Sequence, residues 1–377
     1  MDTRTSGMEG LVNIFHSTYK GRRVLVTGHT GFKGSWLCQW LVELGAEVMG
    51  YALTPQTNPN HFDLLGLKID SRIGDISDEA TLKKTLYSFE PEIIFHLAAQ
   101  PLVRYSYQNP IETYNTNVMG TLKLLDVCIE LKSLSAVVCV TTDKVYENKE
   151  WDRPYKEEDR LGGYDPYSSS KACSEILVNS VRNSFFNVND YGNTHNVLIA
   201  TARGGNVVGG GDWSDDRLIP DIIRSIKDGQ QLHIRNPKST RPWQYVLDCL
   251  SGYLILGSRL FEGDISASSG WNFGPQESEL TSVEQILKFA KNEFPELIYS
   301  LSSDSNPHEA GALQLDSNKA ISNLGWQPLI SDKEFFRITF DWYSKFYKND
   351  EVISRQNILE YMDQLAQYDM NYSTNAS

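Results

Sequence analysis

Residues 23–34 read Arg-Val-Leu-Val-Thr-Gly-His-Thr-Gly-Phe-Lys-Gly, and this stretch decides the class of fold. Its first five residues are rich in valine and predict a short strand. Three glycines then recur at every third position, namely Gly28, Gly31 and Gly34. Between a strand and a helix, such glycines permit a tight turn and a close approach to a pyrophosphate, which binds at the helix N-terminus. The stretch therefore predicts a dinucleotide-binding loop.

The residues that follow complete a βαβ unit. Apolar residues recur with helical spacing over 36–44, and Gly45 stands at a helix C-terminus. Alternating strands and helices continue beyond it and predict a Rossmann-type α/β fold, a doubly wound parallel sheet. The expected strands after the first cover 47–52, 72–76, 92–100, 136–140 and 196–202.

The composition changes after residue 203, where a glycine-rich stretch leads away from the sheet. We expect an NAD-binding Rossmann domain over 21–203, to which some later segments return. A smaller α/β lobe that binds the substrate is expected mainly over 204–350. Residues 1–20 are expected to form a loosely held N-terminal extension, and 351–377 a C-terminal helix and tail.

Composition and charge exclude several functional classes. The chain has 377 residues, of which 40% are hydrophobic, and 35 basic against 48 acidic residues give a net charge of −13. This charge argues against nucleic acid or an anionic membrane as the main partner. Five scattered cysteines form no CxxC pattern, which indicates a reducing cytoplasm and neither a disulfide framework nor a metal site. No segment is long and apolar enough to span a bilayer, and the first twenty residues lack the apolar core of a signal peptide.

Three polar residues end the strand predicted over 136–140. Thr142, Asp143 and Lys144 stand at its carboxyl end, and open α/β sheets bind their ligands at these ends. A strand-end turn is the structural alternative for Asp143. Its position beside a hydroxyl and an amine favours a role as an acid.

A second group of polar residues opens the helix predicted from Pro166. Asp165 is suited to its N-cap, and Tyr167 and Lys171 lie one turn apart on the same face. An ammonium beside a phenol favours the phenolate, so Tyr167 is expected to act as a base near neutral pH. A Tyr-x-x-x-Lys pattern alone is also typical of a solvated helix face. The glycine loop and the polar strand end favour the catalytic interpretation.

Cofactor contacts are expected from the glycine loop and from the ends of three strands. Asp75 is placed to accept from an adenine amino group, although it could instead cap the helix that follows. The second strand ends without an acidic residue for the ribose and without an arginine for a 2′-phosphate, so it does not distinguish NAD from NADP. The candidate residues are Gly28, Thr30, Gly31, Phe32, Gly34, Asp75, Ile76, Leu97, Ala98, Ala99, Tyr167 and Lys171.

Seven motifs carry a resemblance to a known family. The chain resembles the nucleotide-sugar 4,6-dehydratases of the extended short-chain dehydrogenase/reductase family, and among them those that act on CDP-glucose. The motifs are TGHTGFKG (27–34), AAQPLVR (98–104), TDKVY (142–146), GYDPYSSSK (163–171), NVVGGGDW (206–213), RNP (235–237) and RPWQ (241–244).

The resemblance implies that CDP-D-glucose loses water to give CDP-4-dehydro-6-deoxy-D-glucose, with tightly held NAD reduced and regenerated in each cycle. Tyr167 then removes the 4-hydroxyl proton, Lys171 lowers the pKa of Tyr167, and Thr142 hydrogen-bonds the 4-oxygen. Asp143 protonates the departing 6-hydroxyl. Lys144 stands where relatives carry a glutamate, and we predict that it is the C5 base, with its pKa lowered if the Lys171 ammonium lies close.

The resemblance also suggests substrate contacts and partners. Arginines recur in the second half of an acidic chain and suit a diphosphate, although Arg224 in particular is equally suited to a surface ion pair. A homodimer or homotetramer is expected by analogy, paired through helices over 114–131 and 166–184. The substrate-binding candidates are Gln100, Arg104, Asn206, Arg217, Arg235, Arg241 and His308.

Two other functions remain open from the sequence. A nucleotide-sugar 4-epimerase, decarboxylase or a dehydratase for another nucleotide would use the same scaffold, but epimerases do not need the adjacent acid and base at Asp143 and Lys144. A non-catalytic Rossmann protein that senses dinucleotides would not need Tyr167, Lys171 and Asp143 together.

Overall fold

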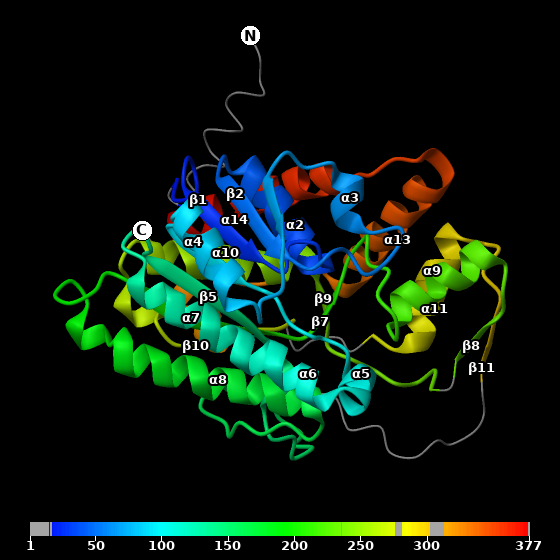
Figure 1. The fold of residues 1–377 in the computed structure, drawn as a ribbon. Coiled ribbons are helices and arrows are strands. Elements are labelled where there is room, and N and C mark those ends of the chain that lie inside the picture. The colour runs from blue at the N-terminus through cyan, green and yellow to red at the C-terminus, as the bar shows by residue number, and fades with distance from the viewer. Residues whose placement is uncertain (1–14, 16, 235, 276–280, 302–312, 376–377) are drawn as a thin grey trace, which may run out of the picture.

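A parallel sheet of seven strands forms the centre of the computed structural model, which describes residues 15, 17–234, 236–275, 281–301 and 313–375 (Figure 1). The order β3-β2-β1-β4-β5-β6-β10 is that of a Rossmann fold with one further strand. The predicted fold class is confirmed. The strands are β1 (Arg23–Thr27), β2 (Glu47–Ala52), β3 (Asp70–Ile73), β4 (Ile93–His96), β5 (Ala136–Thr142), β6 (Leu198–Gly204) and β10 (Gly270–Phe273).

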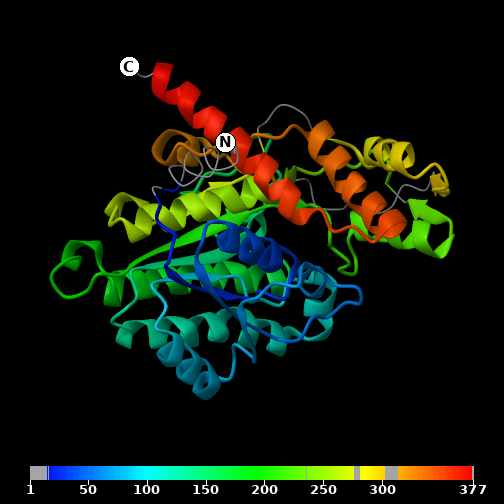
Figure 2. The same cartoon turned by 90° about the horizontal axis from the view of Figure 1, so that it is seen from above.

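Helices cover both faces of this sheet because successive side chains of each strand point to opposite faces (Figure 2). Val24 and Val26 of β1 belong to the core on one face, and Leu25 between them belongs to the core on the other. The first face packs against α2 (Phe32–Glu43), α10 (Val246–Phe261) and α14 (Ser354–Asn375). The second packs against α4 (Glu79–Phe89), α7 (Thr121–Glu130) and α8 (Pro166–Phe185).

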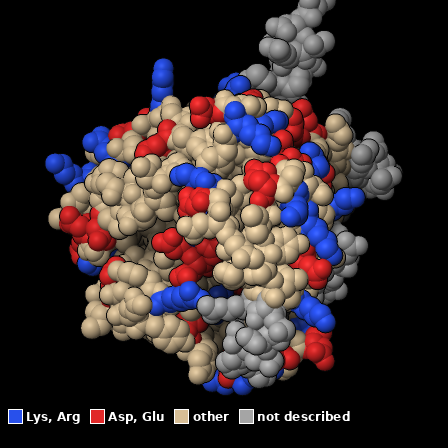
Figure 3. Space-filling view, turned by 90° about the vertical axis from the view of Figure 1, so that its right-hand side faces the viewer, with Lys and Arg blue, Asp and Glu red and all other residues tan. Residues whose placement is uncertain are grey.

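A smaller lobe lies beside the carboxyl ends of the strands, at the right of Figure 1. It contains α9 (Leu218–Asp228), α11 (Val283–Glu293) and the parallel pair of β8 (Leu232–Ile234) and β11 (Tyr299–Leu301). On the face seen in Figure 3, acidic and basic side chains are interspersed and a hollow opens between them. The net negative charge is therefore not gathered into one patch on this face.

Shorter segments connect the layers and the lobe. β7 (Asn206–Val208) and β9 (Trp243–Tyr245) form a separate parallel pair that leads into α10. The remaining helices are α3 (His61–Leu65), α5 (Val103–Gln108), α6 (Pro110–Tyr114), the π-helical η1 (Asn115–Gly120), α12 (Asn318–Leu324), α13 (Asp332–Asn349) and the 3₁₀ turns η2 (Asp143–Val145), η3 (Val188–Asp190) and η4 (Ile265–Ala267). None of the helices in the described ranges is both long and apolar enough to cross a bilayer.

The end of the expected N-terminal extension is not loosely held. Phe15 and Tyr19 are buried in the core on the α10 face. The Tyr19 hydroxyl donates to the carbonyl oxygen of Leu254 at 2.5 Å, and the hydroxyls of Thr18 and Ser258 lie 2.8 Å apart. Its aromatic side chains anchor the described end of this segment in the core, so the expectation that it is loosely held as far as residue 20 is wrong.

Candidate active site

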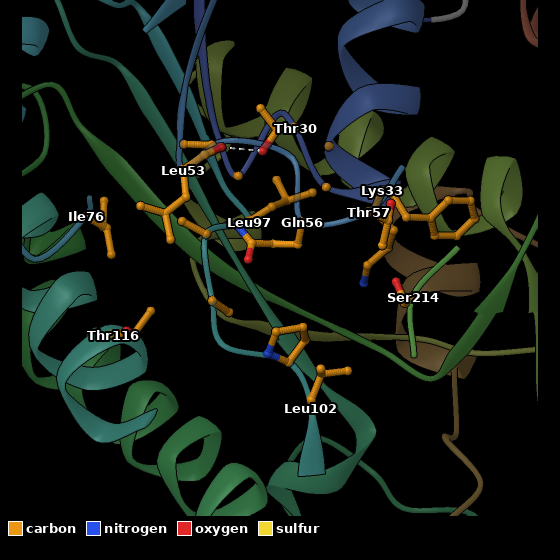
Figure 4. A pocket seen from close by; sticks show the side chains of 18 of the residues that line it. Thr30, Lys33, Leu53, Gln56, Thr57, Ile76, Leu97, Leu102, Thr116 and Ser214 are labelled. Atoms are coloured by element: carbon orange, nitrogen blue, oxygen red, sulfur yellow. Dashed lines mark hydrogen bonds between the residues drawn. The ribbon is translucent and has the colours of Figure 1, made fainter. Parts of the chain in front are cut away.

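A cavity of about 930 Å³ opens at the carboxyl ends of the central strands. The strand order reverses between β1 and β4, and ligands of open α/β sheets bind at such a switch point. Figure 4 shows Lys33 and Ser214 at one end of the cavity, Leu97 near its middle, and Ile76 and Thr116 at the other end. The cavity therefore extends from the glycine loop after β1 to residues at the ends of β2, β3, β4 and β5.

The glycine loop has the geometry that a dinucleotide requires. Gly28 has φ +75°, and a Cβ on it would lie 2.8 Å from the backbone nitrogen of Ala98. A Cβ on Gly34 would lie 2.1 Å from the carbonyl oxygen of Gly28. Gly31 caps α2 without a side-chain hydrogen bond, which leaves the helix N-terminus to a ligand phosphate. Side chains at these positions would fill the cradle, so the loop fits a dinucleotide.

The structure brings the predicted cofactor residues together, because every one of them lines the cavity. Asp75 accepts a hydrogen bond from the backbone nitrogen of Ser77 at 2.7 Å, whereas Asp78 caps α4. Asp78, and not Asp75, is therefore the N-cap of α4. Sequence reasoning missed the segment after β2, which also lines the cavity through Leu53, Gln56, Thr57, Asn60 and His61.

Helix α8 presents its first turn to the cavity. Asp165 caps it by accepting from the backbone nitrogen of Ser168 at 2.9 Å, as the sequence predicts. Tyr167 and Lys171 are both buried and both line the cavity. The Lys171 Nζ donates to the carbonyl oxygen of Val140 at 3.2 Å, which ties the helix to β5.

The end of β5 meets this turn of α8. The Thr142 hydroxyl donates to Oδ1 of Asp143 at 2.8 Å, and Thr142 is also hydrogen-bonded to Tyr167. Both strand-end residues are buried. A phenol, a hydroxyl and a carboxyl group therefore lie together, beside the amine of Lys171, as the spacing of the two motifs predicts.

Burial controls the protonation of these groups. It raises the pKa of Tyr167 to about 12, so the phenolate expected near neutral pH is not found in this structure. Burial also raises the pKa of Asp143, which favours the protonated carboxyl that an acid needs. The pKa of Lys171 falls to about 8, because of burial first and the charge of Lys33 second.

Two further lysines lie near the reacting groups. Lys144 is partly buried, and its charge acts to lower the pKa of Asp143. Lys33 is the cation that lowers the pKa of Lys171, whereas the sequence had led us to expect Lys171 as the cation that acts on Lys144. A lysine in the first turn of a helix opposes the helix dipole, and this signal could have singled out Lys33.

The predicted substrate residues differ in where the structure places them. Arg217 lines the cavity and donates to Oδ2 of Asp212 at 3.1 Å. Arg241 is not among the cavity-lining residues, and its guanidinium donates to the carbonyl oxygen of Thr240 at 3.3 Å. Arg235 and His308 lie outside the described residues.

Three other candidates, Gln100, Arg104 and Asn206, do not line the cavity. The side chain of Gln100 is buried and donates to Thr113 Oγ1 at 2.8 Å within its own loop. Arg104 is largely exposed and pairs with Asp216 at 2.6 Å. Asn206 begins β7 and is not among the cavity-lining residues. Arg224 pairs with Asp221 at the surface, which agrees with the ion-pair alternative.

Other buried groups have structural roles. His96 is hydrogen-bonded to Thr27 and Thr121, and burial lowers its pKa to about 3, as befits a packed strand histidine. All five cysteines are unpaired. In the part of the chain that the structure describes, no three His, Cys, Asp or Glu side chains are grouped as a metal site would need.

Comparisons with known proteins give consistent relatives. The family model described as GDP-mannose 4,6 dehydratase matches residues 25–339. CDP-glucose 4,6-dehydratase of Salmonella typhimurium is 47% identical over 349 residues, which cover 91% of this chain and 97% of that protein. dTDP-D-glucose 4,6-dehydratase of Mus musculus is 26% identical, with 87% and 90% covered.

Solved structures share the fold at lower identity. UDP-glucuronic acid 4-epimerase from Bacillus cereus, in complex with UDP-glucuronic acid and NAD, is 24% identical and has a TM-score of 0.71. The match covers 86% of this chain and 100% of that one. This likeness supports the Rossmann-type architecture.

Proposed function

The chain belongs to the family described as GDP-mannose 4,6 dehydratase, and from this premise we propose that it is an NAD-dependent nucleotide-sugar 4,6-dehydratase acting on CDP-D-glucose. The products are CDP-4-dehydro-6-deoxy-D-glucose and water. The 47% identity to CDP-glucose 4,6-dehydratase over nearly the whole of both chains carries this proposal. The meeting of Tyr167, which lines the cavity, with Thr142 and Asp143 at the end of β5 supports it.

NAD, when bound, supplies the position that takes a hydride from the sugar and returns it within the same cycle. The glycine loop and the strand ends that include Asp75, Leu97 and Ala98 would hold it. NAD would lie next to Tyr167 and Lys171, because these two residues line the same cavity as the glycine loop. No net reductant is needed.

Tyr167 accepts the proton of the 4-hydroxyl in the oxidation step. With a pKa of about 12, it must first lose its own proton. The hydrogen bond with Thr142 and the charge of Arg217 favour this loss, because both lower the pKa of Tyr167. Thr142 also holds the sugar oxygen during the step.

The 4-ketone acidifies the C5 proton, and elimination of water follows. The C5–H bond breaks with transfer of its proton to Lys144, the C6–O bond breaks, and the leaving oxygen takes the proton of Asp143. The buried carboxyl of Asp143 suits this role because its pKa is raised. Lys144 suits the base role by its place next to Asp143, and it must be neutral to act.

Incubation of the purified protein with CDP-glucose, dTDP-glucose and GDP-mannose, without added reductant, tests the proposal. We expect a C6 methyl signal in the proton spectrum of the CDP product. A product that keeps its C6 hydroxymethyl group but changes configuration at C4 would identify an epimerase instead. No turnover of any sugar, together with dinucleotide binding, would identify a non-catalytic sensor.

We also propose a homodimer or homotetramer in the cytoplasm. Apolar side chains are exposed along the surface of α6 to α8, whereas monomers rarely expose contiguous apolar patches. We expect Ile176→Glu to shift sedimentation to the monomer, and Ile265→Glu in η4 to leave it unchanged. An unchanged state for both would contradict pairing through this surface. The exposed residues are Ile111, Met119, Ile129, Ile176 and Phe185.

A further inference from the structure

Lys33 holds an amine inside the cavity without a carboxylate partner. It stands in the first turn of α2, and its Nζ lies 3.4 Å from the Tyr253 hydroxyl and 5.6 Å from the centre of that ring. In the part of the chain that the structure describes, this amine forms no ion pair. Figure 4 shows its side chain at the same end of the cavity as Ser214. A tyrosine hydroxyl compensates a buried ammonium only in part.

Lys171 brings a second amine to the same cavity. It is 7% exposed, and its Nζ donates to the carbonyl oxygen of Val140 at 3.2 Å. The nearby carboxylate of Glu175 is already paired with Arg203 at 2.9 Å. Two ammonium groups that share a poorly solvated space disfavour each other, and their titrations become coupled.

Gly204 makes the room in which Lys33 meets its hydroxyl partner. A Cβ at this position would lie 2.8 Å from the Tyr253 hydroxyl and 3.1 Å from Sγ of Cys249. The absence of a side chain on Gly204 therefore leaves space for the Tyr253 hydroxyl at the end of β6. Gly204 is the β6 partner of Thr142, and the Lys171 Nζ binds the carbonyl oxygen of Val140 two residues earlier on β5. The Lys33 and Lys171 amines therefore lie at the ends of the same two neighbouring strands.

We propose that Lys33 is a positioning residue of the active site, and that its charge governs how firmly Lys171 holds its proton. Lys33 acts through Lys171 and need not touch the substrate. The consequence for catalysis rests on the proposed function, whereas the coupling between the two amines does not.

The surroundings of both amines support this assignment. Burial lowers the pKa of Lys33, and the charge of Arg217 lowers it further. For Lys171, burial is the first cause of a pKa of about 8 and Lys33 is the second. The other titratable groups that face the pair are Asp143, Tyr167, Cys249 and Tyr253 on the Lys33 side, and His96, Cys139 and Glu175 on the Lys171 side.

The test measures the protonation of Lys171 directly. The full chain is labelled briefly with acetic anhydride across pH 6–10, and mass spectrometry follows acetylation of Lys171 against exposed Lys68. We expect half-maximal reactivity of Lys171 near pH 8 in the unsubstituted chain. Lys33→Met should move this midpoint to higher pH, while burial of Lys171 should keep it below that of a free lysine. Lys33→Arg keeps the charge and should leave it at or below the original position.

The two variants distinguish an effect of the Lys33 charge from a structural effect of the substitution. An unchanged Lys171 curve in Lys33→Met, or an equal upward shift in Lys33→Arg, would overturn the proposal. Circular dichroism checks the fold, and Lys33→Gln replaces the methionine variant if that one does not fold. If turnover requires charged Lys171, the fall of kcat at high pH should move upward in parallel. Absence of turnover would count against the proposed function alone, because the labelling curve needs none.

Discussion

The hydroxyl of Thr142 donates to Oδ1 of Asp143 at 2.8 Å, between two consecutive residues of which one ends β5 and the other begins η2. The bond holds a buried carboxyl whose other oxygen, Oδ2, faces the open side of Gly205. A buried carboxyl with a raised pKa retains a proton that it can give to a leaving group. We therefore expect Asp143 to act as an acid at the strand end, and not only to form a turn there.

Asp143→Asn keeps the shape and the bond from Thr142 but removes the proton that the leaving oxygen needs. We expect water loss to slow by roughly 100- to 10,000-fold, the usual contribution of general acid catalysis. Oxidation at C4 should persist, so the reduced cofactor should accumulate and absorb at 340 nm. Product formation at the original rate without this accumulation would rule out Asp143 as the acid.

The residues at the cofactor end of the site could be predicted from the sequence because a geometric rule brings them together. Parallel strands end at one edge of a sheet, so residues that follow β1, β3 and β4 must meet there. Gly28, Asp75 and Ala98 are far apart in the chain, yet each was predicted from its place at or just after the end of an expected strand. The N-cap of α8 at Asp165 was likewise readable from local chemistry.

The rest depends on contacts that no local pattern contains. Lys33 meets Tyr253 over 220 positions in the chain, and Arg104 meets Asp216 over 112. The high pKa of Tyr167 is a result of burial by the whole fold, and the groups that lower it are Thr142 and the distant Arg217, whereas we had expected Lys171 one turn away to do so. Phe15 lies near the start of the chain but is buried, and its carbonyl oxygen accepts from the hydroxyl of Ser258 on α10.

Arg217 and Arg104 should respond differently to substitution. Arg217 lines the cavity, whereas Arg104 forms an exposed ion pair with Asp216. We expect Arg217→Ala to raise the KM for CDP-glucose by at least about tenfold, as loss of a charge-assisted contact implies. Arg104→Ala should change it by less than about fivefold, since exposed pairs contribute about 0–1 kcal/mol. Steady-state kinetics decides, and the reverse ranking would place the diphosphate near α5.

Asp248 predicts a pH dependence of stability. It accepts from the backbone nitrogen of Leu329 at 2.8 Å and from the Tyr361 hydroxyl at 2.7 Å, joining α10 to α14. Burial raises its pKa to about 7 from an ordinary 3.8, so the folded state holds this proton more firmly than the unfolded chain. The resulting stabilisation is complete below about pH 4 and is lost as the pH rises through 7.

Asp248→Asn removes this titration. We expect the unfolding temperature of the variant, relative to the unsubstituted chain, to improve between pH 5 and pH 8. Asp350→Asn at an exposed position is the matched control and should show a constant difference. Calorimetry at both pH values measures the effect. A constant difference for Asp248→Asn would mean that this carboxyl stays ionised in the folded protein.

Gly204 gives the sharpest test of packing behind the site, because its neighbour Gly205 is a natural control. A Cβ on Gly204 would press against the hydroxyl of fully buried Tyr253 at 2.8 Å, and an aromatic ring in a filled core cannot withdraw without displacing others. Gly204→Ala should therefore cost about 1–3 kcal/mol in urea unfolding, as overpacking does. Gly205→Ala should be tolerated, since its closest contact is an ordinary 3.5 Å. Adding Tyr253→Phe to Gly204→Ala removes the clashing atom, so the two effects should be non-additive. Additive losses would show that the strain of Gly204→Ala lies elsewhere.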